Sequence, residues 1–441
     1  MTSISLDRWP KWEQVILFAT IVSLGIGYPF FESAFGGKSV SLTDYLVIFF
    51  LPLIGWKYRK SLVTVIMSKK IVPTYIFLSS LLIPIFFHLE GDGWVSVIGW
   101  LRPCMMFVFV VLLFREYKET ENTVVMASWT LGLITCTVGL LGWVAAVLLN
   151  IENPFVHIRP YYLGIIPIQL SALDGHPNGA ALVLFIIITV LYFLNRDAKT
   201  NKVVIAVGIL GMILTLSKSI LIYSALVCLC ITRGKRYSKV LINSVGVFIL
   251  ILYLIFTHAL PQQVKDVHQN NASFYIYSQK PLVEYMGLSL VKTPYLANKI
   301  AAVQIFLEHP WTGVGPRNFV PAMEQMKLNG SYPAESIYLS PHCTYTSVLA
   351  RFGLIGFLGL IYYMWWIWSS IKTVKNRTLR SLFSIVYFCF GLEAINSDLE
   401  YSHLFWFFNA WLMTYLLHQS SSSYDHEEYA RQQGGNSQYQ Q

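Results

Sequence analysis

Runs of apolar residues, separated by short polar segments, follow one another along most of the chain. A helix needs about 20 mainly apolar residues to cross a bilayer, and twelve runs approach that length. They cover residues 14–32, 42–56, 71–88, 94–114, 124–149, 180–195, 203–216, 219–232, 239–258, 345–371, 381–395 and 402–418. The pattern predicts an all-α polytopic membrane protein with about twelve transmembrane helices.

The composition supports this class. Hydrophobic residues make up 55% of the chain and charged residues only 12%, about half the charged fraction of a typical soluble domain. The net charge of +9 could suggest a nucleic-acid partner, but the basic residues lie mainly in short loops, so we predict none. The six cysteines lack the spacing of a disulfide framework or a metal site, and we predict neither.

The basic residues also predict an orientation, because short cytoplasmic loops are enriched in lysine and arginine. With the N-terminus inside, the inner loops hold 18 such residues and the short outer segments hold 3. Both termini are therefore predicted to be cytoplasmic. The same topology places residues 259–344 outside the membrane.

The predicted organisation has four parts. Residues 1–258 form helices one to nine, residues 259–344 an outer catalytic loop with short helices, residues 345–418 helices ten to twelve, and residues 419–441 a disordered cytoplasmic tail rich in Ser and Gln. Within the loop, Tyr295–Glu308 has the spacing of an amphipathic helix, with Ile300, Val303, Phe306 and Leu307 on one face.

Residues 309–319 hold the first candidate chemistry. The turn Gly313-Val314-Gly315 could direct backbone N–H groups toward an anion, or could simply reverse the chain after a helix. Arg317 follows, and is either a phosphate clamp or a solvated loop side chain.

His342 lies where the loop runs into an apolar helix. A lone histidine is commonly structural, yet at the outer membrane surface and near cations it would suit a general base. Charged residues within membrane spans are costly and often functional, and Arg102, Lys218, Arg351 and Glu393 all map to the outer half of the bilayer. They would suit an anionic head group, while snorkelling to the interface is the alternative for each.

The outer segment 150–178 adds Arg159 and Asn178. Asp174 and His176 precede Asn178, but two such residues are weak evidence for a metal. A helix start capped by Asn178 explains the pattern equally well.

Four of these stretches resemble the superfamily of O-antigen ligases and O-antigen polymerases over roughly residues 90–395. The matching stretches are HPWTGVGPRNF, PHCTYTSVLARFGLIGF, HPNGAA and LTLSKS. The resemblance implies a bacterial inner-membrane enzyme that works on the periplasmic side. Its donor would be an undecaprenyl-pyrophosphate-linked glycan and its acceptor a glycan or lipid A–core. Membrane lipids and envelope polysaccharide assembly proteins are the further partners it implies.

The resemblance also implies site residues and a metal-independent, inverting reaction without a cofactor. His342 takes the place of the family's loop histidine, the base. Lys218 takes the place of the hairpin arginine that holds the pyrophosphate, although lysine lacks the planar fork of arginine. The family's second arginine is missing, and Lys292 and Lys299 are the nearest substitutes.

The remaining expected substrate-binding residues are Arg102, Arg159, Asn178, Gly313, Gly315, Arg317 and Arg351. One long outer loop favours a ligase, and a polymerase that uses the same donor is the alternative within the family. A lipid or polysaccharide flippase is the alternative of another class. It would place its ionisable residues nearer the bilayer midplane.

Overall fold

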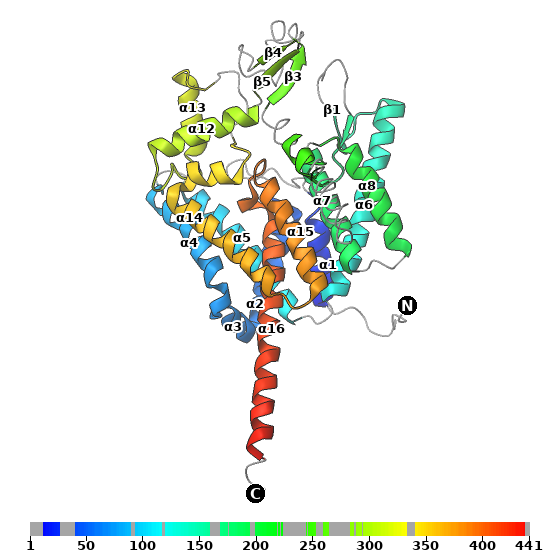
Figure 1. The fold of residues 1–441 in the computed structure, drawn as a ribbon, viewed down its shortest axis with the longest axis vertical. Coiled ribbons are helices and arrows are strands. Elements are labelled where there is room, and N and C mark those ends of the chain that lie inside the picture. The colour runs from blue at the N-terminus through cyan, green and yellow to red at the C-terminus, as the bar shows by residue number, and fades with distance from the viewer. Residues whose placement is uncertain are drawn as a thin grey trace.

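The fold was analysed in a computed structural model (Figure 1). It describes residues 12–26, 40–89, 93–116, 120–158, 168–174, 176–194, 199–217, 219–220, 222–223, 244, 246–252, 259–263, 283–285, 288–292, 294–332 and 340–436. Over these residues the protein is mostly helical.

Five helices of the described chain are long and apolar enough to cross a membrane: Lys69–Phe87, Trp94–Arg115, Thr120–Leu149, Pro177–Leu194 and Thr344–Thr373. Trp12–Ser23 and Thr200–Leu214 are shorter apolar helices. The chain is thus a polytopic membrane protein, as predicted.

Ten of the predicted apolar runs coincide with a helix. These helices are α1 (Trp12–Ser23), α2 (Leu42–Lys57), α4 (Val72–Phe87), α5 (Gly93–Glu116), α6 (Thr120–Leu149), α7 (Pro177–Leu194), α8 (Lys199–Leu214), α14 (Thr344–Thr373), α15 (Arg377–Glu393) and α16 (His403–Asn436). The runs at 219–232 and 239–258 lie mostly outside the described residues. The total of twelve spans therefore stays a prediction.

Aromatic side chains fill the centre of the bundle, where α14 packs on α4 and α16 packs on α5. The rings of Phe77, Tyr363 and Trp406 stack with centroids 4.9 to 6.2 Å apart. Because lipid tails are as apolar as a protein core, such close packing is what holds membrane helices together. This packing holds α14 against α4 and α16 around Tyr363.

The prediction of an all-α protein was wrong in two places. Strands β1 (Val156–Ile158) and β2 (Ile168–Leu170) form an antiparallel pair. Strands β3 (Ala259–Gln263), β4 (Val283–Tyr285) and β5 (Leu288–Lys292) form an antiparallel sheet in the order β3–β5–β4. Strands this short have too few residues for the alternation of apolar and polar positions to stand out.

Helix α12 (Pro294–Glu308) confirms the amphipathic helix predicted in the outer segment. On the predicted apolar face, Ile300, Val303 and Leu307 are exposed. The buried face of the helix contains Ala301, Ala302 and Ile305, which pack with α13 (Phe319–Leu328) and α14. Small side chains on that face allow the close approach.

The tail prediction also needs correction, because α16 continues from the bundle to Asn436. A polar composition argued for disorder, but extending an existing helix avoids the cost of a new nucleus. Residues 437–441 lie outside the described part.

The elements of the predicted outer segments gather at one end of the molecule. In Figure 1, α12, α13 and strands β1 and β3–β5 lie at that end, while α3 (Arg59–Ile66) and the far end of α16 lie at the other. The predicted inner loop 57–70 and the predicted outer loop are thus on opposite sides of the bundle. Which side faces the cytoplasm stays a prediction, as does the division of residues 1–418 into three parts.

Candidate active site

Helix α14 is broken at Gly353, whose φ of 63° and ψ of −160° are not helical. The loop after α12 fills the break with backbone hydrogen bonds. Val314 N–H donates to Ala350 O (3.0 Å), Gly315 N–H to Arg351 O (3.0 Å) and Leu354 N–H to Pro310 O (2.8 Å). The loop thereby fixes the direction of residues 344–352, the part of α14 next to His342.

This contact occupies the N–H groups that a phosphate-binding turn would need. Gly313 N–H donates to His309 O at 3.0 Å, and Gly315 N–H donates within the break of α14. Both glycines are buried, and Arg317 is half-buried beside them. An anion-binding role for Gly313, Gly315 and Arg317 stays a prediction.

The break predicts a specific cost for Gly353→Ala. A Cβ at residue 353 would lie 2.3 Å from Trp311 O at a φ of +63°, a backbone region that is nearly exclusive to glycine. We expect a loss of roughly 2–5 kcal/mol in the free energy of unfolding, measured by thermal and denaturant unfolding in detergent. Gly330→Ala is the control: Gly330 has a φ of +69° but open space around it, so only about 1 kcal/mol should be lost. Equal losses would contradict a role of the break itself.

His342 lies in a short loop that one carboxylate holds in place. Ser340 Oγ donates to Asp398 Oδ2 at 2.8 Å, and Cys343 N–H donates to Asp398 Oδ1 at 3.3 Å. His342 itself has a φ of 46°, a conformation that histidine adopts more readily than most residues. The ring of Tyr295 meets the imidazole edge-on, with centroids 5.5 Å apart.

The surroundings of His342 favour the neutral imidazole. Burial lowers its pKa below the ordinary 6.5, and the charges of Arg351 and Lys299 lower it further, while Asp398 raises it. A neutral imidazole can accept a proton from an attacking hydroxyl. The electrostatic contributions also place Arg351, Lys299 and Asp398 around this one histidine.

Arg351 occupies the centre of a buried polar cluster beside the loop. Its Nη1 donates to Ser347 Oγ at 2.8 Å and lies 3.3 Å from Asp398 Oδ2 and 3.7 Å from Glu400 Oε1. Its guanidinium also lies over the ring of Phe319, 5.1 Å from the centroid. The side chain predicted to bind substrate thus already has two carboxylate partners.

Asp398 and Glu400 were not among the sequence-based candidates. A signal was present: residues 396–401 read NSDLEY and hold two carboxylates at the outer end of a span, opposite the predicted cations. The search concentrated on cations for an anionic substrate and left these carboxylates out.

Lys299 reaches the same region from α12. It is buried, and its Nζ donates to Asn396 Oδ1 at 3.1 Å. Burial lowers its pKa to about 8, so its charge is held less firmly than that of an exposed lysine. The other candidate for the missing arginine, Lys292, ends β5 and pairs through its backbone with Ala259.

Lys218 and Arg159 lie outside the described residues. The structure does describe the residues on either side of Lys218. Ser217 Oγ donates to Asn178 Oδ1 at 2.5 Å. The side chain of Ser219 forms a hydrogen bond with Glu393. Tyr223 OH also donates to Glu393 Oε1 at 2.7 Å.

The end of α15 links residues 217–219 to the loop that contains His342. Ser397 Oγ donates to Glu393 Oε2 at 3.4 Å, and Thr344 Oγ1 donates to Ser397 O at 2.6 Å. Segments far apart in the sequence therefore converge at the C-terminal end of α15.

Arg102 belongs to a different group of helices. Its Nε donates to Asp44 Oδ1 at 2.6 Å, and His403 Nε2 lies 2.7 Å from the same oxygen. These contacts join α5, α2 and α16. For metals, the described residues contain no group of three His, Cys, Asp or Glu side chains that could hold an ion.

Comparison with protein families bears on the segment that contains most of this site. Residues 203–361 match the family described as O-antigen ligase. The matched segment includes Lys218, Lys299, His342 and Arg351. No curated protein shows significant similarity to the chain. The chain is a polytopic membrane protein whose residues 203–361 match the family described as O-antigen ligase.

Proposed function

We propose that the protein transfers a glycan from an undecaprenyl-pyrophosphate carrier to a sugar hydroxyl on the periplasmic side of the bacterial inner membrane. The observation that carries this proposal is the setting of His342. It lies in the matched segment, half-buried, and close enough to Asp398, Arg351 and Lys299 for their charges to shift its pKa.

The chemistry follows from what must happen at the two reacting ends. The attacking hydroxyl loses a proton, and His342 accepts it. The departing pyrophosphate gains negative charge, and fixed cations stabilise that charge. Loss of one such preorganised donor typically costs about 3–4 kcal/mol of transition-state stabilisation. Lys218 and Lys299 supply the cations, and Arg351 holds Asp398 and Glu400 beside the histidine.

We favour a ligase that transfers the finished polymer onto lipid A–core. The predicted outer side has one long segment, residues 259–344, and a shorter one, residues 150–178. A polymerase that adds repeat units to a second carrier-linked glycan is the alternative, because it would use the same donor and the same groups.

The test is transfer by the purified protein in detergent, without any gradient. Lipid-linked glycan is supplied with either lipid A–core or a second carrier-linked glycan, and products are separated by size. Attachment to lipid A–core supports a ligase, and elongation supports a polymerase. A protein that only moves lipid across the membrane would make neither product, and that result would refute an enzymatic function.

Lys218→Ala is expected to reduce transfer about 100- to 1,000-fold, because a departing pyrophosphate would lose one fixed cation. Lys218→Arg should keep most of the activity, since the charge remains. The measurement is kcat with lipid-linked donor. Lys202→Ala, in the predicted inner loop 196–202, is the control and should transfer normally. Normal transfer by Lys218→Ala would place the pyrophosphate site elsewhere.

The pH profile should reflect the lowered pKa of His342. A base acts in its neutral form, so activity is lost as pH falls through its pKa. Because burial lowers this pKa, the acid limb of kcat/KM should lie below pH 6.5, the ordinary value for histidine. Asp398→Asn removes a charge that raises the pKa, and should move the limb to still lower pH. A limb above pH 6.5 would argue against His342 as the base.

A further inference from the structure

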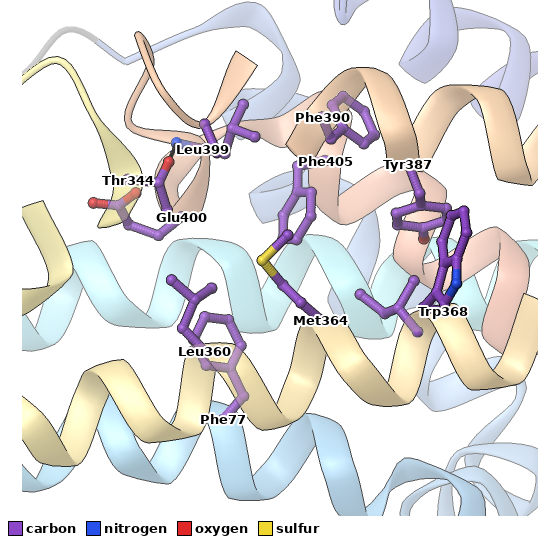
Figure 2. Close-up of a pocket in the computed structure, with 12 residues that line it drawn as sticks. Phe77, Thr344, Leu360, Met364, Trp368, Tyr387, Phe390, Leu399, Glu400 and Phe405 are labelled. Carbon is purple, nitrogen blue, oxygen red and sulfur yellow. Dashed lines mark hydrogen bonds between the residues drawn. The ribbon is translucent and has the colours of Figure 1, made fainter. Parts of the chain in front are cut away.

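A narrow cavity of about 60 Å³ lies inside the bundle next to the histidine loop. Helices α4, α14, α15 and α16 surround it (Figure 2). Most of its wall is apolar, with Leu360, Met364, Phe390 and Phe405 among the lining residues.

The apolar lining of the cavity favours a hydrocarbon ligand over water. Apolar cavities remain dry unless several polar groups can hold a water molecule. Tyr387 lines the cavity, but its hydroxyl donates to Asn409 Oδ1 at 3.0 Å. The other polar lining groups, Thr344 and Glu400, lie together in Figure 2, away from Tyr387 and Trp368. The rest of the cavity therefore fits an apolar chain.

The lining of the cavity follows α14. Leu360 and Trp368 are eight residues apart on this helix, which corresponds to about 12 Å. Trp368 is 44% exposed, so one end of the lining reaches the surface of a helix that is apolar enough to cross a membrane. At the other end, Thr344 follows His342 by two residues. A chain in the cavity would thus run from that surface toward the loop that holds His342.

Glu400 lines the end of the cavity near the His342 loop, and one of its carboxylate oxygens has no hydrogen-bond partner in the described structure. Its Oε1 accepts from Ser347 Oγ at 2.9 Å, whereas its Oε2 is buried and has no hydrogen-bond partner in the described structure. Burial and the neighbouring Asp398 raise the pKa of this carboxyl, although Arg351 lowers it. In the neutral form, Glu400 can donate one hydrogen bond to an oxygen at the head of an apolar chain.

We propose that this cavity binds the prenyl units nearest the pyrophosphate of the lipid-linked donor, with Glu400 at the polar end. The inference rests on the proposed function for the identity of the chain. The donor is favoured over an acylated acceptor because its prenyl chain begins at the leaving pyrophosphate. The acyl chains of an acceptor are separated from the attacking hydroxyl by its sugars.

Filling the cavity tests the proposal. Met364→Trp and Ala394→Leu add bulk at lining positions, and Leu358→Trp adds it on the same helix at a side chain that is 58% exposed. Each is assayed with the same glycan on undecaprenyl pyrophosphate and on a single-isoprene pyrophosphate. The filling variants should raise KM for the undecaprenyl donor about tenfold, toward the KM of the short donor. The values for Leu358→Trp should equal those of the unmodified protein.

An unchanged ratio of the two KM values in both filling variants would overturn the proposal, as would equal effects of Leu358→Trp. A second measurement needs no turnover. Undecaprenyl pyrophosphate with a photoreactive diazirine on its first isoprene units is crosslinked to the full-length protein, and labelled peptides are identified by mass spectrometry. Label on α14 and α15 around Leu360, Met364 and Phe390 is expected, and label confined to other helices would refute the site. Specific label without glycan transfer would keep this inference and reject the proposed function.

Discussion

Replacing His342 with alanine is expected to lower kcat for glycan transfer by about 100- to 10,000-fold, the usual contribution of a positioned general base. The half-buried imidazole lies near Asp398, and its lowered pKa favours the neutral form that can accept a proton. The measurement is the rate of product formation by purified protein at saturating donor. Expression and unfolding temperature should be close to those of the unmodified protein.

His309→Ala is the matched control. His309 lies in the same outer segment, but its side chain is exposed, so the rate should change little. Full activity of His342→Ala would remove His342 from the mechanism. Equal losses in both variants would point to a general disturbance of the loop.

Arg351→Met is expected to destabilise the protein by about 3–5 kcal/mol, because it leaves the buried Glu400 and the half-buried Asp398 without their cation. Arg351 lies within 3.7 Å of both Asp398 and Glu400, and its side chain is only 12% exposed. The free energy of unfolding in detergent measures the effect. The double variant Arg351→Met/Asp398→Asn should recover part of the loss, since it also removes the unpaired negative charge.

Lys327→Met provides a comparison from the same outer segment. Lys327 pairs with Glu324 at 3.3 Å, but that carboxylate is 50% exposed. Exposed pairs contribute about 0–1 kcal/mol, so this variant should unfold almost like the parent. A loss of similar size for Lys327→Met and Arg351→Met would show that burial is not what makes the Arg351 cluster important.

Local patterns accounted for most of the helices. The run 345–371 predicted α14, and the spacing of residues 295–308 predicted α12. The break at Gly353 could not be predicted, because its cause is a backbone contact with Trp311 and Gly313, about 40 residues earlier in the sequence. For a related reason, the spacing could not show that Ile300, Val303 and Leu307 are exposed: periodicity identifies an apolar face but not the surface that covers it.

In the candidate site, too, the sequence showed the types of residue, and only the structure showed which residues they contact. The types of residue it would need, a histidine and cations near a membrane surface, were visible in the sequence and in its resemblance to the O-antigen ligases. Their partners were not. Arg351 meets Asp398 across 47 residues, and Lys299 meets Asn396 across 97.

The sequence by itself determined the membrane class, most helix positions and the residues from which chemistry is expected, because each depends on apolar length, charge or motif within a short stretch. Only the tertiary structure decided that Asp398 holds the His342 loop, that Arg351 already has carboxylate partners, and that an apolar cavity lies beneath them. These features depend on how α14 packs against α15 and on the turn between α15 and α16. Such packing is set by the whole bundle at once, and no single segment encodes it.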